Sequence, residues 1–402
     1  MGDAGDRGDL TRHTRGFTDL GLDKDVGLHH HVLPGGQSWI GSAPKGHRTL
    51  CCDRRCTITV GDLGEFGVVA RIAGRLPQGE TVLLGPGDDA ALVGAPDGRV
   101  VISTDLLLEG RHFRRDWSSG YHIGRKAAAQ NLADIVAMGA DPTGLVVGLG
   151  VPADLEATWI DALADGFRDE CALVGATVAG GDTVRSDLIV LGVTALGDLG
   201  GRAPVVRSGA RPGDVVAVAG RLGPSAAGLA LLLAGGPGAS GAVAGAGGPG
   251  VAVGAGGPGG AVGGPEETAD PFAWLVDAHR CPRPPYACGP GAARLGATAM
   301  LDVSDGLLQD LGHVCAASGV SIDLDPDAFT PSAPLSAAAA HLGADPLEWI
   351  LTGGEDHALA ATFPPEVRLP PEWLVVGRVG EGREVTVRGR PPGRAGWDHF
   401  KE

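Results

Sequence analysis

The chain lacks the long apolar runs that membrane-spanning segments need. Nowhere in its 402 residues do about eighteen apolar residues follow one another without interruption, which is roughly the length that crosses a bilayer. The first residues alternate charge and glycine and contain no apolar h-region of a secretion signal. The sequence therefore predicts neither secretion nor a membrane partner, and it favours a cytoplasmic location.

Cysteine is also scarce and poorly placed for zinc sites or disulfides. Of the 7 cysteines, Cys51, Cys52 and Cys56 form the one cluster, and their spacing is not a paired zinc pattern. The odd total speaks against a complete disulfide framework. Both observations indicate a reducing compartment.

Positive charge is in deficit. The 32 basic residues face 48 acidic ones, and the net charge of -16 would repel a polyanion unless a strong basic patch existed. The sequence contains no such patch, so it predicts no nucleic-acid partner. Small anionic substrates remain compatible with this charge where metal ions offset it locally.

The common nucleotide-binding signatures are absent too. No Gly-x-x-x-x-Gly-Lys-Ser/Thr loop occurs, and neither do the protein-kinase catalytic loop and Asp-Phe-Gly motif. Any ATP chemistry must therefore use another fold.

The length suffices for two ordinary domains, each with its own core. We expect a poorly ordered N-terminal extension over residues 1–57, an N-terminal domain over 58–205 and a C-terminal α+β domain over 206–402. Residues 235–265 are almost wholly Gly, Ala, Val and Pro, too poor in large side chains to pack a core. We interpret them as a flexible insertion in the second domain.

Hydrophobic periodicity predicts a mixture of helices and strands, which is an α+β pattern. Helical spacing marks residues 63–72, 121–138, 159–167, 224–233 and 307–315, and strand-like runs occur at residues 82–84, 100–103, 143–150, 188–196 and 215–218. In the second helix, Lys126, Gln130 and Asp134 share one side because they are four residues apart. Ser304 or Asp305 is expected at the N-terminus of the last helix.

Aspartates beside small residues recur at the edges of these apolar segments. Each one alone is explained by ordinary turns and helix caps. Several such clusters together favour Mg²⁺, which binds a few carboxylates and shares its other sites with water and substrate phosphates. The segments are Gly85-Pro86-Gly87-Asp88-Asp89-Ala90, Ser103-Thr104-Asp105, Asn131-Leu132-Ala133-Asp134, Gly180-Gly181-Asp182-Thr183 and Asp302-Val303-Ser304-Asp305-Gly306.

These motifs, in this order and followed by Thr352-Gly353-Gly354-Glu355-Asp356, resemble those of the thiamine-monophosphate kinase family. The resemblance runs from about Asp62 to the Trp397-Asp398-His399-Phe400 ending and leaves out the N-terminal extension and the insertion. It implies the two-domain α+β fold of the superfamily that includes aminoimidazole ribonucleotide synthetase and selenophosphate synthetase. It also implies a homodimer in which the N-terminal domains pair through their sheets.

The resemblance implies transfer of the γ-phosphoryl group of ATP to thiamine monophosphate, with several Mg²⁺ ions. Because the acceptor phosphate is already largely ionised, we expect direct in-line transfer with neither a general base nor a covalent nucleophile.

Carried over motif by motif, the resemblance assigns three groups of residues. The metal-binding positions are Asp89, Ser103, Thr104, Asp105, Asp134, Asp182, Asp302 and Asp305. The nucleotide-contacting positions are Gly181, Arg207 and Ser304. The substrate-contacting positions are His112, Glu355 and Trp397, of which Glu355 suits a charge or hydrogen-bond partner and Trp397 a stacking face.

The chain departs from the family pattern at two positions: Ala133 stands where Ser is frequent, and His357 where Tyr is common. Two alternatives stay open. One is another ATP-dependent enzyme of the superfamily, similar to aminoimidazole ribonucleotide or selenophosphate synthetase. The other is a non-catalytic nucleotide-binding module, against which the complete set of acidic motifs argues.

Overall fold

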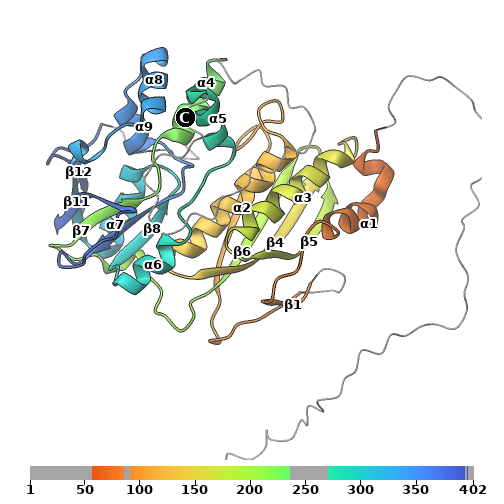
Figure 1. Cartoon of the computed structure of the whole chain (residues 1–402), viewed down its shortest axis with the longest axis horizontal. Coiled ribbons are helices and arrows are strands. Elements are labelled where there is room, and N and C mark those ends of the chain that lie inside the picture. The colour runs from red at the N-terminus through yellow and green to blue at the C-terminus, as the bar shows by residue number, and fades with distance from the viewer. Residues whose placement is uncertain (1–56, 86–90, 236–269, 394–395, 397–402) are drawn as a thin grey trace, which may run out of the picture. The chain divides into compact units, whose positions relative to one another are not determined.

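A computed structural model of the chain describes residues 57–85, 91–235, 270–393 and 396 (Figure 1). The expected N-terminal extension, apart from Thr57, and the expected insertion, apart from Gly235, lie outside these ranges. Asp89 and Trp397 lie outside them as well.

Helices and strands alternate along the described chain. The helices are α1 (Val60–Ala73), α2 (Gly120–Ala137), α3 (Ala157–Ala172), α4 (Pro224–Leu233), α5 (Pro271–Arg280), α6 (Cys288–Leu295), α7 (Leu307–Ser318), α8 (Ala333–Leu342) and α9 (Pro346–Thr352). The strands are β1 (Val82–Leu84), β2 (Leu92–Val93), β3 (Val101–Leu108), β4 (Asp141–Val151), β5 (Thr177–Arg185), β6 (Val190–Asp198), β7 (Val215–Ala219), β8 (Ala299–Val303), β9 (Val320–Leu324), β10 (Ala358–Phe363), β11 (Trp373–Glu381) and β12 (Val385–Val387).

The first half of the described chain forms a four-stranded sheet in the order β3-β6-β4-β5. Its pairs are antiparallel except for β4 with β5, which run parallel. Helices α2 and α3 lie side by side across one face of this sheet (Figure 1). Side chains of β3 alternate in exposure, so Ser103 and Asp105 share the face covered by helices, while Ile102, Thr104 and Leu106 share the open face.

The second half forms a six-stranded sheet in the order β12-β9-β11-β7-β10-β8. Strands β8 and β10 are buried along their whole length, which explains why they contain continuous apolar runs instead of an alternating pattern. The boundary expected at residues 205 and 206 falls between the two sheets, and the domain division stays a prediction.

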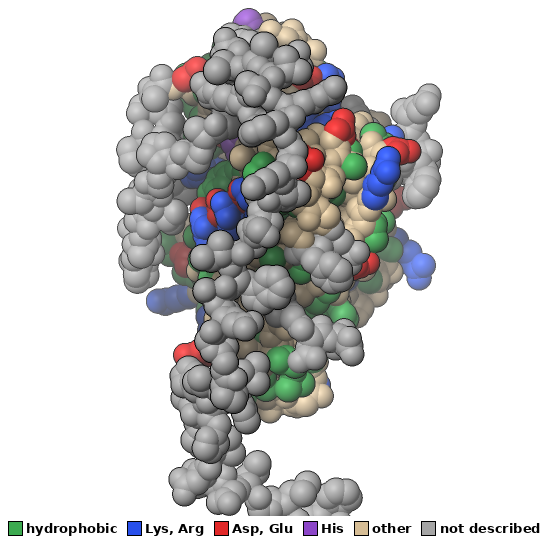
Figure 2. All heavy atoms as spheres, turned by 90° about the vertical axis from the view of Figure 1, so that its right-hand side faces the viewer, with side chains coloured by type: hydrophobic (Ala, Val, Ile, Leu, Met, Phe, Trp, Pro, Cys, Tyr) green, Lys and Arg blue, Asp and Glu red, His purple; other side chains and the backbone are tan. Residues whose placement is uncertain are grey.

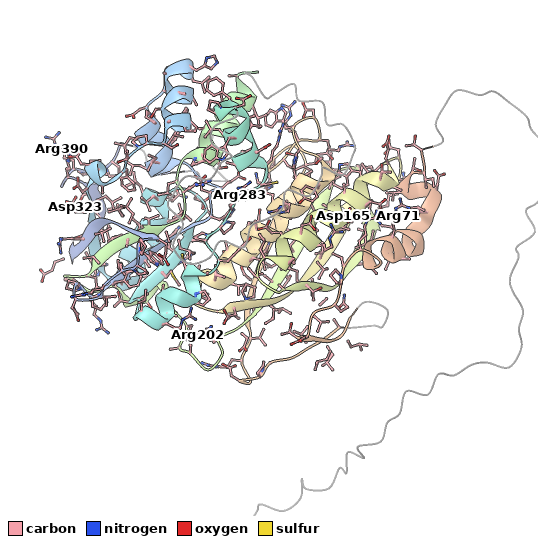
Figure 3. The ribbon with its side chains drawn as sticks, viewed as in Figure 1. Arg71, Asp165, Arg202, Arg283, Asp323 and Arg390 are labelled. Atoms are coloured by element: carbon pink, nitrogen blue, oxygen red, sulfur yellow. The ribbon has the colours of Figure 1, made fainter. Side chains whose placement is uncertain are left out.

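Local signals account for the helix ends. Thr59 and Asp62 form a capping box at the start of α1, and Ser119 caps α2 through the backbone N–H of His122. Helix α2 ends at Ala137 with Met138 as its C-cap, and Gly139 follows at a φ of +75°, the left-handed conformation in which glycine commonly ends a helix. Figure 3 labels Arg71 of α1 near Asp165 of α3. Arg71 Nε pairs with Oδ1 of Asp161, on the same helix α3, at 2.5 Å.

Helices α2 and α3 approach each other through two glycines. A Cβ at Gly124 would overlap the carbonyl oxygen of Leu163, and one at Gly166 would overlap that of Tyr121. Next to Gly124, Arg125 of α2 pairs with the buried Glu170 of α3. The two helices therefore pack more closely than any side chain at these glycines would permit.

Most predicted elements are confirmed, with shifted ends. The strand predicted at residues 100–103 continues to Leu108, and the Gly-Gly-Asp-Thr motif lies in the middle of strand β5, which the sequence did not predict. The prediction that Ser304 or Asp305 begins helix α7 is wrong by one or two residues: Gly306 is the N-cap, at a φ of +125° that favours glycine.

Among the described helices, none has the length and apolar content that a membrane crossing requires. Where described residues are visible in Figure 2, acidic and basic side chains lie interspersed with hydrophobic ones.

We expect Gly166→Ala to lower the free energy of unfolding by about 1–3 kcal/mol, because its methyl group forces α2 and α3 apart. Chemical denaturation measures this difference. The matched control is Gly312→Ala in α7, where a Cβ has no atom within 4 Å and Ala is the better helix former. A Gly166→Ala variant as stable as the wild type would contradict the close packing.

Candidate functional site

The site begins with two polar side chains on the helix-covered face of strand β3. Ser103 Oγ donates a hydrogen bond to Asp134 Oδ2 of helix α2 at 2.6 Å. Asp105 Oδ2 accepts one from Gln130 Nε2 of the same helix at 3.1 Å, and its backbone N–H bonds Asn131 Oδ1 at 3.2 Å. The strand and the helix thus hold the carboxylates of Asp105 and Asp134 on neighbouring supports.

A third carboxylate comes from the second sheet. Asp302 on β8 is buried, and its Oδ2 lies 3.0 Å from Nδ1 of His357. Although burial opposes protonation of the imidazole, the Asp302 carboxylate raises the pKa of His357. The histidine that replaces the family's common tyrosine therefore engages one of the predicted metal ligands.

These three carboxylates influence one another. Burial, followed by the negative charges of Asp302 and Asp105, raises the pKa of Asp134 to about 7, while the Ser103 hydroxyl opposes the shift. Residues separated by almost 200 positions are thereby brought into one electrostatic cluster. We call Asp105, Asp134 and Asp302 the carboxylate cluster.

Two closely packed loops present the second-sheet side of the site. Glu355 N–H bonds the carbonyl oxygen of Ser304 at 2.7 Å, and a Cβ at Gly354 would overlap that same oxygen. At the other loop, Asp310 Oδ2 of helix α7 accepts hydrogen bonds from the backbone N–H groups of Asp305 and Gly306 at 3.0 and 3.1 Å. Burial, Asp302 and Asp305 raise the pKa of Asp310 to about 7.

The donor set suits a hard divalent cation in chemistry, since it consists of carboxylate oxygens that repel one another. Across the described ranges, however, no three His, Cys, Asp or Glu side chains stand in an arrangement ready to hold a metal ion. Asp302 is paired with His357 and Asp134 accepts from Ser103. Cation binding would thus have to draw these carboxylates together.

Two of the predicted substrate-contacting residues meet at a lysine. Lys126 Nζ of α2 lies 3.1 Å from Glu355 Oε2 and 3.4 Å from the carbonyl oxygen of His112. Burial opposes ionisation of Glu355, but the positive Lys126 and the nearby His279 hold the pKa of that carboxyl at about 2. His112 Nδ1 accepts the backbone N–H of Leu108 at 3.0 Å, so in the neutral ring the proton lies on Nε2.

Other predicted residues lie apart from the carboxylate cluster. Asp182 on β5 pairs with Gly148, Gly148 with Gly192, and Gly192 with Leu106 of β3. Asp182 is therefore on the open face and at the opposite edge from β3, about 14 Å away at ordinary strand spacing.

Thr104 shares the open face, and its Oγ1 donates to the Val193 carbonyl at 3.0 Å. Gly181 lies beside Val147, whose carbonyl oxygen a Cβ would overlap. Arg207 is exposed in a short 3₁₀ turn (Arg207–Gly209), and its carbonyl oxygen accepts from Ser318 Oγ at 2.8 Å.

Asp89 and Trp397 lie outside the described residues. Gly396 is described, and a Cβ there would lie 2.5 Å from the carbonyl oxygen of Asp305 and 2.8 Å from Gln309 Cβ. The chain therefore returns to the Asp305 loop one residue before Trp397.

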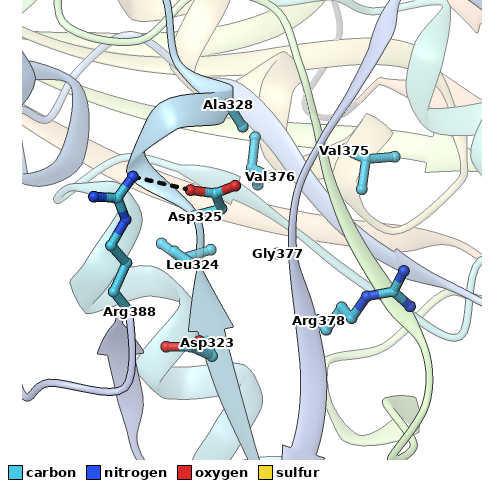
Figure 4. A pocket seen from close by; sticks show the side chains of 9 residues that line it. All are labelled: Asp323, Leu324, Asp325, Ala328, Val375, Val376, Gly377, Arg378 and Arg388. Carbon is cyan, nitrogen blue, oxygen red and sulfur yellow. Dashed lines mark ion pairs between the residues drawn. The ribbon is translucent and has the colours of Figure 1, made fainter.

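A cavity of about 350 Å³ opens elsewhere, beside strands β9 and β11 (Figure 4). Arg388 Nη2 lies 3.7 Å from Asp325 Oδ1 at its edge, and Asp323 and Arg378 also line it. It contains none of the predicted site residues. The candidate site is therefore the carboxylate cluster, which consists of predicted site residues, and not this cavity.

The site also contains residues that motif reasoning did not assign. The spacing of Lys126 and Gln130 predicted that they share one helix side with Asp134, but it did not predict which residues they contact. Asn131 belongs to one of the quoted motifs but received no role, and Asp310 contacts the backbone of the neighbouring Asp305 and Gly306. His279 offered no signal, because it acts through Glu355, which is distant in the sequence.

We expect metal-free Asp134→Asn to be more stable than the wild type at pH 8. The folded pKa of Asp134, about 7, exceeds its ordinary value of 3.8, so the native state binds more protons between these values and loses stability as pH rises. Removing the charge should add about 1–3 kcal/mol at pH 8 and little at pH 4. Urea denaturation in EDTA at both pH values measures the difference.

The control for this experiment is Asp154→Asn, which removes an exposed carboxylate. Added Mg²⁺ at pH 8 should then stabilise the wild type more than Asp134→Asn. An Asp134→Asn variant less stable than the wild type at pH 8 contradicts the clustered repulsion.

The sequence matches one family model and several known proteins. The family model described as AIR synthase related protein, N-terminal domain, matches residues 87–199. A thiamine-monophosphate kinase of Mycobacterium tuberculosis is 48% identical over 347 residues, covering 86% of this chain and 94% of the relative. The corresponding kinase of Corynebacterium glutamicum is 38% identical, with coverages of 85% and 95%.

Solved structures of thiamine-monophosphate kinases have a similar fold. A thiamine-monophosphate kinase from Stenotrophomonas maltophilia superposes with a TM-score of 0.66 at 30% identity, over 81% of this chain and 95% of the other. AaThiL complexed with AMPPCP and TMP gives a TM-score of 0.65 at 31% identity, with coverages of 86% and 100%. The expected α+β fold of the aminoimidazole ribonucleotide synthetase-like superfamily is confirmed. The chain belongs to the thiamine-monophosphate kinase family.

Proposed function

We propose that the chain transfers the γ-phosphoryl group of ATP to thiamine monophosphate, giving thiamine diphosphate and ADP. The observation that carries this is the convergence of Asp105, Asp134 and Asp302 from two sheets and helix α2, beside loops that carry the family's substrate and nucleotide motifs. The 48% identity to a thiamine-monophosphate kinase supports the reaction, and the solved complex with AMPPCP and TMP supports the pair of substrates.

The acceptor itself determines which catalytic groups are needed. A phosphate monoester has a second pKa near 6, so at about pH 7 most of the nucleophile is ionised and a general base is unnecessary. The obstacle is the approach of two anions. We infer direct in-line transfer, for which the protein supplies position and charge compensation.

We propose that Asp105, Asp134 and Asp302 hold Mg²⁺, with Ser103 orienting Asp134 through its hydroxyl. When bound, Mg²⁺ offsets the repulsion between the two phosphates and stabilises charge on the transferred group. Asp89, Thr104, Asp182 and Asp305 remain proposed ligands from the family motifs. Gly181, Arg207 and Ser304 remain proposed nucleotide contacts.

Substrate recognition falls to His112, Glu355 and Trp397 in this proposal. The Glu355 carboxyl, with its pKa held at about 2, is ionised at neutral pH and can accept a hydrogen bond from a polar group of thiamine monophosphate.

The decisive experiment incubates the protein with Mg²⁺, ATP and thiamine monophosphate and identifies the products by mass. Thiamine diphosphate with equimolar ADP is expected. If ADP formation depended instead on an aminoimidazole precursor or on selenide, the function would be that of another superfamily member, and the absence of all turnover would favour a binding module.

We expect Asp105→Asn to lower kcat by about 100-fold, because it removes a charged ligand at nearly constant volume. Steady-state kinetics at saturating Mg²⁺ measures this, and circular dichroism checks that the fold is intact. Asp154→Asn should retain wild-type kcat. Near-normal turnover of Asp105→Asn would contradict a metal-binding role.

We also propose that the chain forms a homodimer through the open face of the four-stranded sheet. That face carries exposed apolar side chains on β3, β4 and β5, which water contacts unfavourably in a monomer. They are Ile102, Leu106, Val146 and Val184.

Light scattering during gel filtration should give the wild type twice the 40.4 kDa mass of one chain. Leu106→Asp should move it to one chain mass, because a carboxylate would be buried without a partner. Leu374→Asp, at an exposed position of β11, should stay dimeric. A dimeric Leu106→Asp variant would place the interface elsewhere.

A further inference from the structure

Lys126 joins the two described segments that carry substrate-contacting residues. Its side chain is 4% exposed, and its ammonium group lies between Glu355 Oε2 and the His112 carbonyl oxygen, at 3.1 and 3.4 Å. An ammonium group buried to this extent is costly unless it is paired. Both of these partners belong to the proposed substrate subsite.

A second side chain approaches the same carboxylate oxygen. Nδ1 of His279, on helix α5, lies 3.3 Å from Glu355 Oε2 and 3.1 Å from Ser225 Oγ. Burial, reinforced by the charge of Lys126, lowers the pKa of His279 to about 3, so this histidine is neutral at physiological pH. Lys126 therefore supplies the compensating charge, and His279 limits where the carboxylate can move.

The geometry leaves one oxygen of Glu355 for a ligand. Among the described residues, the hydrogen bond and ion pairs of this carboxylate all go to Oε2, while the side chain as a whole is 33% exposed. The backbone is constrained as well, since Glu355 has a φ of +62° and its N–H bonds the Ser304 carbonyl. Oε1 therefore remains for a ligand, on a residue that is held by Lys126, by His279 and by the Ser304 carbonyl.

A purely stabilising ion pair would need no such arrangement, because buried pairs of this kind are often no better for stability than apolar side chains. The second contact of Lys126, to the backbone carbonyl of His112, also holds the segment that carries this proposed substrate contact. One lysine thereby sets the positions of two substrate contacts.

We infer that Lys126, supported by His279, is a positioning residue for substrate recognition: it holds Glu355 so that Oε1 accepts a hydrogen bond from an N–H donor such as the amino group of the thiamine pyrimidine. Since the ammonium already offsets the charge of Glu355, the carboxylate acts as a directed acceptor instead of as a counter-ion for the thiazolium ring. This inference rests on the proposed function and assigns a specific role within it.

The test compares Lys126→Met and His279→Asn with the wild type, by steady-state kinetics and by calorimetric binding of thiamine monophosphate without ATP. We expect the KM and the Kd for thiamine monophosphate to rise about tenfold in Lys126→Met, and less in His279→Asn, because a hydrogen bond to a charged group is misplaced. The KM for ATP should stay within about twofold of wild type. The matched control is His313→Asn, an exposed histidine of α7.

A double-mutant cycle separates positioning from folding. In the Glu355→Gln background, Lys126→Met should add less than about twofold to the KM for thiamine monophosphate, because the group it orients has already been changed. If Lys126→Met does not fold, Lys126→Arg takes its place, and its charge with altered reach should give an intermediate rise in KM.

The inference is overturned if the variants lose thermal stability while their affinity for thiamine monophosphate equals that of the wild type. Equal and independent losses in the double-mutant cycle would also overturn it. Failure of the proposed function looks different: the wild-type protein would then form no thiamine diphosphate, and a wild type that does not bind thiamine monophosphate at all would overturn both.

Discussion

The close packing of helix α2 is the constraint on which the site depends. Glycines provide it: Gly124 against α3, and Gly289 of α6 against the carbonyl oxygen of Val136, are positions where any Cβ would overlap backbone. Helix α2 is thus fixed between the two halves of the described chain. Because Lys126, Gln130 and Asp134 project from that helix, their places relative to both sheets follow from it.

Electrostatic compensation is the second element of the site. The carboxylate cluster gathers negative charge in a partly buried place, and burial together with the repulsion from Asp302 and Asp105 raises the pKa of Asp134. His357 offsets part of that charge at Asp302, as Lys126 does at Glu355. The carboxylate cluster therefore favours a cation. Glu355, whose negative charge is balanced by Lys126, favours a polar organic group.

The two faces of the four-stranded sheet have separate roles. The helix-covered face carries Ser103 and Asp105 into the carboxylate cluster, whereas the open face carries apolar side chains together with Thr104 and Asp182. Strand alternation makes this separation unavoidable, since neighbours in one strand point to opposite faces. In the proposed homodimer, Asp182 and Thr104 lie on the face that meets the second copy.

Much of the fold could be predicted from local patterns. Helical spacing located α2 and α4 almost to the residue, because amphipathic periodicity and the Gly139 stop are encoded locally. Strand β5 was missed because its glycines and Asp182 look like a turn, and its pairing with β4 across the sheet overrides that preference. For β8 and β10, no alternation exists to be read, since both faces are buried.

The family, the acidic motifs and the kind of chemistry could be recognised without a structure, because they are properties of short segments and their order. The fold was needed to show which of these aspartates lie close together, that His357 pairs with Asp302, and that Lys126 connects His112 with Glu355. Lys126 and Glu355 are 229 residues apart, so their contact depends on how helix α2 packs between the sheets, whereas the Asp302–His357 pair depends on the pairing of strands β8 and β10. A pattern of neighbouring residues contains no information about that packing.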